Sequence, residues 1–175
     1  MHSFPDLVMR STTFALSSLK EAEAEINEAL QTSGATRHVK NLQAIQLHRA
    51  VVAIGIFSLF DSIVQDKLAC ADGFAAAREC LKSSGEIDLG SRFSLFVHAI
   101  NVLKHGRGRS YDALIAMNVA DLPFRIRRPG EDSFSEGDVS EVATLIEVDD
   151  RFVQGCADLV AQFAGVINKA HSVWI

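Results

Sequence analysis

Apolar residues recur at helical spacing along most of this sequence. Pro5 suits the first turn of a helix that runs to about Leu30, and the polar and glycine residues at 32–34 end it. Thr36 can then cap a second, long helix that reaches about Leu68, because its apolar positions are mostly three, four or seven residues apart. The pattern therefore predicts two long consecutive helices.

A short third helix is predicted over Gly73–Leu81. The fourth helix begins near Asp88 or Ser91 and ends at His105, and Gly106 follows as a left-handed terminator. This fourth helix is apolar nearly all round, which indicates that most of its surface is buried.

The last helix starts after Asp149 and places six residues on one stripe: Phe152, Cys156, Leu159, Phe163, Ile167 and Ala170. The region before it is less regular. Ser110–Met117 fits a short helix, and Phe124–Arg127 alternates like a short strand that Thr144–Val148 can pair with, giving a small β-hairpin at about 124–148. Asp138–Ile146 fits a helix equally well. The predicted fold is an all-α up-and-down bundle in a single domain, 1–175.

Composition agrees with a folded chain of this class. The 175 residues are 48% apolar and 22% charged and include only three prolines, so a full core can form without a metal or disulfide. Cys70, Cys80 and Cys156 have no CxxC spacing and are typical of small buried residues in a reducing compartment. Met1–Arg10 lacks the pattern of a signal peptide, and Ala50–Phe60 is too short to cross a bilayer, so a cytoplasmic, non-membrane protein is expected.

The net charge of −5 is unevenly distributed. Residues 101–128 contain six basic side chains and two acidic ones, whereas residues 131–150 contain eight acidic side chains and no Lys or Arg. A net acidic chain can therefore carry one local basic site.

The fourth helix also carries a polar stripe. At 100° per residue Ser94, His98, Asn101 and His105 lie on one side of it. Two imidazoles and an amide can satisfy one another as a simple hydrogen-bonded seam. They can also line a partly buried cleft or a subunit interface. Because this helix is apolar nearly all round and also carries the polar stripe, it needs more cover than one small bundle gives, which predicts a two-fold homodimer.

The turn after the stripe is basic. Lys104, Arg107 and Arg109 precede any acidic residue, and Tyr111 follows them. Cations at a helix C-terminus complement the helix dipole, which accounts for Lys104 better than for the two arginines. An imidazole beside several cations suits phosphodiester chemistry without a metal: histidine moves protons while arginine stabilises charge in the transition state.

The segment from Asn101 to Tyr111 (NVLKHGRGRSY) resembles the signature region of the HEPN superfamily. The stretch from Arg49 to Leu68 also looks like the long family helix with a mid-helix acidic residue, here Asp61. The resemblance implies an all-helical dimer that acts on RNA, as many members are metal-independent endoribonucleases in toxin–antitoxin, defence or stress systems. It implies that His105 is the motif histidine and that Asn101 is the polar residue after the motif arginine.

The motif arginine itself is replaced by Ile100. Either Arg92, Arg107 or Arg109 supplies the cation from another direction, or the site binds RNA without cleaving it. Arg92 and His98 also have a literal motif spacing, but six residues place them about 120° apart on a helix. The candidate catalytic residues are accordingly His105, Asn101, His98 and Arg92, and the candidate RNA-binding residues are Lys104, Arg107, Arg109 and Tyr111.

Two other classes of function stay open. One is a non-enzymatic helical interaction module, for example a dimeric protein neutralised by a nucleotidyltransferase-type antitoxin partner. The other is a histidine phosphotransfer bundle, which the Asn at position 101 disfavours. No cofactor is expected, and no metal site, because His98 and His105 are seven residues apart and no carboxylate lies on their stripe.

Overall fold

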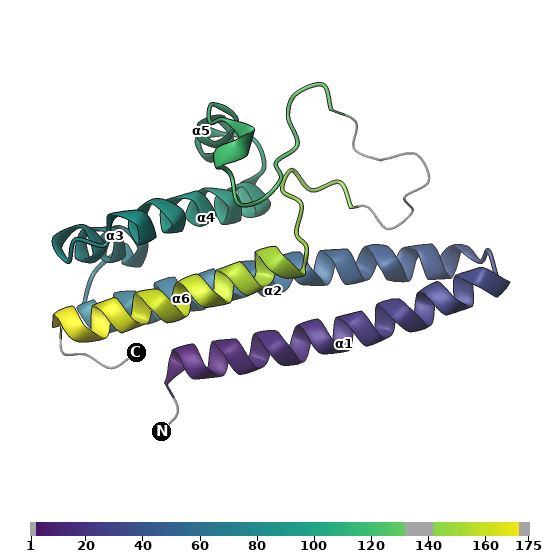
Figure 1. The fold of residues 1–175 in the computed structure, drawn as a ribbon, viewed down its shortest axis with the longest axis horizontal. Coiled ribbons are helices and arrows are strands. Elements are labelled where there is room, and N and C mark those ends of the chain that lie inside the picture. The colour runs from purple at the N-terminus through teal and green to yellow at the C-terminus, as the bar shows by residue number, and fades with distance from the viewer. Residues whose placement is uncertain (1–2, 132–141, 172–175) are drawn as a thin grey trace.

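A computed structural model describes residues 3–131 and 142–171, which form an all-α bundle with a long second helix, as predicted (Figure 1). The helices are α1 (Phe4–Thr32), α2 (Thr36–Leu68), α3 (Gly73–Ser83), α4 (Ile87–His105), α5 (Arg109–Ile115), a 3-10 turn η1 (Val119–Asp121) and α6 (Asp150–His171).

Helices α1, α2 and α6 run along the long axis of the molecule and pack against one another (Figure 1). Helix α3 packs on α2, α4 and α6, and α5 packs on α4. The far end of the α1–α2 hairpin extends beyond the start of α6 (Figure 1). One core cluster includes residues from all six α-helices.

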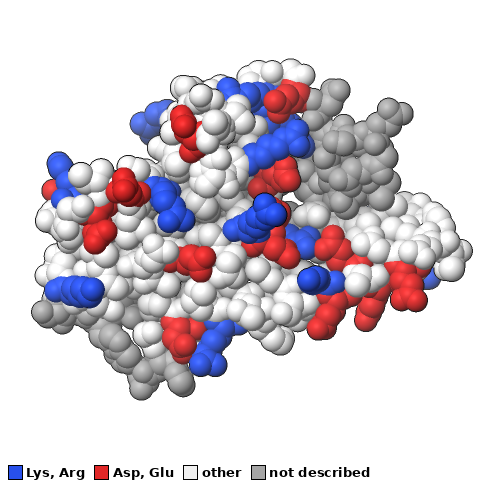
Figure 2. All heavy atoms as spheres, viewed as in Figure 1, with Lys and Arg blue, Asp and Glu red and all other residues white. Residues whose placement is uncertain are grey.

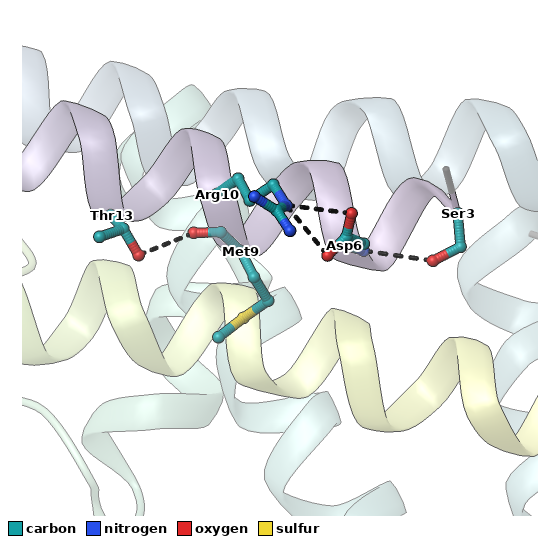
Figure 3. A network of polar contacts seen from close by, with 5 residues as sticks. All are labelled: Ser3, Asp6, Met9, Arg10 and Thr13. Atoms are coloured by element: carbon teal, nitrogen blue, oxygen red, sulfur yellow. Dashed lines mark hydrogen bonds and ion pairs between the residues drawn. The ribbon is translucent and has the colours of Figure 1, made fainter. Parts of the chain in front are cut away.

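Local side-chain contacts fix the start of α1 (Figure 3). The Ser3 hydroxyl accepts a hydrogen bond from the backbone N–H of Asp6 at 3.3 Å, which satisfies one of the free donors at a helix N-terminus. Arg10 binds the Asp6 carboxylate one turn later at 3.1 Å. Met9 points toward α6, where the Gln154 amide lies 4.0 Å from its sulfur.

Phenylalanine rings fill the centre of the bundle, and Phe93 of α4 is the ring they share. Its ring centroid lies 4.4 Å from that of Phe163 on α6 and 5.7 Å from that of Phe57 on α2. Phe60 and Phe74 contact it edge-on, at 6.2 and 5.8 Å. Because Phe93 is fully buried, it joins α2, α3, α4 and α6 in one packed unit.

A buried arginine joins the three long helices. Arg49 of α2 donates to Glu23 of α1 and to Asp150 of α6, both at 2.7 Å. Its guanidinium is almost entirely removed from solvent, and buried charges persist only when they are paired. The sequence pattern did not single out this contact.

Three helix ends differ from prediction. Thr36 is the first residue of α2, and Ala35 occupies the cap position without a side-chain hydrogen bond. Gly106 has a positive φ of 72°, but its ψ of −144° lies outside the left-handed helical well, so the α4 end is more extended than predicted. Ala170 is exposed, because the buried stripe of α6 ends at Ile167.

The predicted β-hairpin is reduced to one antiparallel bridge between Ile126 and Ile146. Two backbone hydrogen bonds of 2.8 and 3.0 Å flank this bridge. Phe124–Arg127 and Thr144–Val148 therefore do meet as predicted, over a shorter length than a strand pair. Residues 142–146 are not helical, and the rest of the alternative helix, 138–141, lies outside the described residues.

Within the described residues, α2 is the one helix with the length and apolar composition of a membrane span, a test that the core helix of a soluble protein also passes. The apolar stretch Ala50–Phe60 lies within this helix, which continues well beyond both of its ends.

Candidate functional site

The polar stripe of α4 lines a cleft of about 270 Å³. Ser94, His98 and Asn101 lie on one side of it, at the spacing of four and three residues that places them on one face of the helix. Val97 of α4 also contributes to the lining, and helix α3 with the residue that caps it provides the rest. The complete set of lining residues is Asp72, Phe74, Arg78, Ser94, Val97, His98 and Asn101.

His98 is tied to the basic turn. Its Nδ1 atom lies 3.2 Å from the Ser110 hydroxyl, in the first turn of α5. Partial burial lowers the pKa of His98, and the positive charge of Arg78 lowers it further. The imidazole is therefore neutral at neutral pH. When Nδ1 donates its proton to Ser110, Nε2 is free to accept one.

Arg78 is the cation of this cleft, and the sequence reasoning missed it. Arg92, Arg107 and Arg109, which the sequence offers as substitutes for the absent motif arginine, do not line the cleft. Arg78 lies on α3, which packs against α4, so its place beside His98 is a tertiary contact. The exposed Asp72 carboxylate on the cleft wall reduces the positive potential there.

The position of α3 depends on Asp61, the mid-helix acidic residue of α2. One carboxylate oxygen accepts from the Phe74 backbone N–H at 3.1 Å, and the other accepts from the Gln65 amide at 2.8 Å. A Cβ atom at Gly73 would stand 2.5 Å from the Asp61 carbonyl oxygen, so only glycine allows this close approach. Asp61 therefore orients one wall of the cleft without lining it.

The other candidate catalytic residues are separated from the cleft. His105 is exposed at the last position of α4 and is not among the lining residues. Arg92 is exposed near the start of the same helix. Ile100, at the position of the motif arginine, is buried in the core. The structure thus brings together Asn101 and His98, and leaves His105 and Arg92 elsewhere.

The basic turn keeps three exposed cations: Lys104, Arg107 and Arg109. The Arg107 guanidinium lies 5.7 Å from the centre of the Tyr111 ring. Tyr111 itself is buried, and its hydroxyl donates to the Arg127 carbonyl at 2.9 Å. Tyr111 therefore has a structural role, because its ring belongs to the core and is not open to a stacking base.

The more distant basic residues serve the fold. Arg128 donates to the carbonyls of Ile115 and Met117 at 2.9 and 2.8 Å, which satisfies free acceptors at the C-terminal end of α5. Arg127 donates to the Thr144 carbonyl at 2.9 Å. Arg125 is exposed but pairs with Glu147 at 3.6 Å, so the basic region predicted over 101–128 contracts to the turn at 104–109. Figure 2 shows mixed charges over α3–α5 and a row of acidic side chains over the second half of α1.

No group of three or more His, Cys, Asp or Glu side chains within 3–131 and 142–171 could hold a metal ion. The three cysteines are free thiols, and burial raises the pKa of Cys156 well above its ordinary value, so this side chain is a neutral thiol. A scan of family models and searches of curated proteins and solved structures find no match to this chain.

Proposed function

We infer that this chain is a HEPN-like RNA-binding protein and that the cleft between α3 and α4 cleaves a phosphodiester without a metal ion. The observation that supports this proposal is the convergence of His98, Asn101 and Arg78 on one open cleft, with Ser110 joining His98 to the turn of exposed cations. An imidazole and a guanidinium are the two groups that metal-independent RNA cleavage needs.

The chemistry follows from these groups. His98 accepts the proton of a 2′-hydroxyl, and the freed oxygen forms a bond with the adjacent phosphorus. The bond from phosphorus to the 5′-oxygen breaks, and that oxygen takes a proton from solvent. Arg78 stabilises the negative charge that builds on the phosphate, and Asn101 can hold a phosphate or base edge. The products are a 2′,3′-cyclic phosphate and a 5′-hydroxyl.

The test is cleavage of single-stranded RNA in EDTA. His98→Ala is expected to reduce the rate at least about a hundredfold, the lower end of the usual contribution of general acid–base catalysis. His105→Ala is the matched control, because His105 is on the same helix but outside the cleft. Loss of cleavage in His105→Ala with no change in His98→Ala would instead favour the histidine that the HEPN resemblance implies.

RNA binding without cleavage is the other form of this proposal. It predicts an RNA affinity that decreases as the salt concentration rises and that is lower still in Lys104→Ala, Arg107→Ala and Arg109→Ala. No cleavage product is expected in any variant. A pure protein that shows neither cleavage nor salt-sensitive binding would contradict both forms.

An interaction module is the second candidate function, and it is favoured by the exposed apolar residues Leu47, Val51 and Leu59 on α2. Exposed apolar residues that share one helix face are typical of surfaces that bind another protein. A helical, non-catalytic dimer is compatible with such a face whether or not the cleft binds RNA.

A further inference from the structure

The side of α2 that faces away from the bundle is apolar at its centre and charged at its ends. Leu47, Val51 and Leu59 are 52%, 57% and 59% exposed, although α2 packs against α1, α3, α4 and α6 on its other sides. Arg37 and Asp66 are exposed near the two ends of the helix, and Asp66 also pairs with Lys67 of the same helix at 3.7 Å. At 100° per residue Arg37 and Asp66 lie within about 60° of Val51, so they share one face with the three apolar side chains.

We propose that this face binds a second copy of the chain, with the two α2 helices antiparallel and the two-fold axis at Val51. In this register, residues at equal distance from Val51 along the sequence face each other. Val51 then meets its own counterpart, and Leu47 packs over Gly55 of the second copy, where no side chain intervenes.

The charges support this occupant. Arg37 is fourteen residues before Val51 and Asp66 is fifteen residues after it, so each Arg37 lies beside an Asp66 of the second copy. The same pairing forms twice in a two-fold dimer, because a two-fold interface repeats every contact. A parallel arrangement would place like charges together at both ends.

The length of α2 is adequate for such an interface. Its 33 residues span about 50 Å. No residue that lines the α3–α4 cleft comes from α2, so the cleft-lining side chains are not the ones this dimer covers. The proposal stands independently of RNA binding, and it moves the predicted dimer interface from α4 to α2.

Cysteine cross-linking tests the position of the axis. Val51→Cys, made in a Cys70→Ser background to remove the half-exposed native thiol, is expected to form a disulfide-linked dimer under mild oxidation. Val119→Cys in the same background is the control, because Val119 is 65% exposed and lies on η1. Cross-linking that is equal at both positions, or faster at position 119, would overturn the proposal.

Sedimentation equilibrium tests the surface itself. The wild-type chain is expected to be a dimer at micromolar concentration, and Val51→Glu a 19 kDa monomer with unchanged helical circular dichroism. Arg37→Asp and Asp66→Arg are each expected to raise the dimer Kd about tenfold, and the double variant to restore it. A monomeric wild type, a Val51→Glu dimer, or failure of the double variant to restore association would overturn the proposal. So would binding of the wild type, but not Val51→Glu, to phosphatidylcholine–phosphatidylglycerol vesicles.

Discussion

Helices α2 and α4 are both apolar over most of their surface, but the bundle covers them to different degrees. Helix α4 is enclosed by α2, α3, α5 and α6, and the cleft lies along its polar stripe. Helix α2 is covered on one side, where Arg49 is buried, and exposes leucine and valine on the other. The apolar content of a helix thus shows that it needs cover, but not whether its own chain provides it.

The largest expected effect is a difference in unfolding free energy between a substitution in α4 and one on the exposed side of α2. Phe93→Ala in α4 removes the ring shared by four other rings and should cost about 3–5 kcal/mol of unfolding free energy. Leu59→Ala on the open face of α2 should cost less than about 0.5 kcal/mol, because the side chain is 59% exposed. Both are measured by urea unfolding in a monomeric Val51→Glu background, so that association does not contribute. Similar losses of unfolding free energy at the two positions would contradict the conclusion that the bundle encloses α4 but leaves this side of α2 exposed.

The helices could be predicted from sequence because apolar spacing and end signals are local. Residues such as Pro5, Asp149 and the glycines at 34 and 106 mark ends that the structure places within a few residues of prediction. Which elements bury the apolar surface of each helix could not be predicted from sequence. The apolar surface of α4 was expected to require a second subunit, and the chain itself buries it.

On its buried side, α2 is held to α1 and α6 by Arg49. The double variant Glu23→Gln, Asp150→Asn leaves this guanidinium buried and without a charged partner, which should cost about 3 kcal/mol. Glu25→Gln is the matched control, because Glu25 is an exposed acid of the same helix as Glu23. Thermal unfolding of both variants provides the measurement, and equal losses would show that Arg49 does not join the three helices.

Disrupting the contact between α3 and α2 should lower the unfolding free energy by a smaller amount. Gly73→Ala places a Cβ atom 2.5 Å from the Asp61 carbonyl oxygen, which forces α3 to move. We expect a loss of about 1–3 kcal/mol, typical of overpacking. Gly55→Ala on α2 meets no atom within 4 Å and serves as the control in the monomeric background. A Gly73→Ala protein as stable as the parent would show that this contact is loose.

The candidate site was predicted in part, for a related reason. His98 and Asn101 were found because helical periodicity places them on one face, and that face does line the cleft. Arg78 was missed, because nothing in the sequence shows which residues of α3 lie against α4. His105 was emphasised by its place in a motif, yet the helix ends there and leaves it exposed. Periodicity identifies residues that share a face, and only tertiary packing identifies what faces them.

The smallest expected effect is the pH dependence of the unfolding free energy that arises from His98 on the polar stripe of α4. Burial, and then the charge of Arg78, lower the pKa of His98, so the folded protein binds this proton less readily than the unfolded chain does. The unfolded state then holds more protons below about pH 6.5, and the free energy of unfolding should fall as the pH decreases from there toward the folded pKa. Solvent reaches this half-exposed ring, so the slope should be shallow.

Two variants isolate this contribution to the pH dependence. His98→Gln should remove its part of the slope below about pH 6.5, measured by urea unfolding. Arg78→Gln should retain the part due to burial and raise the His98 pKa, since one like charge is removed. An NMR titration of the His98 ring reads this pKa directly in the folded protein. If Arg78→Gln left the pKa unchanged, Arg78 would not act on His98, and the cleft would lack the cation that its proposed chemistry requires.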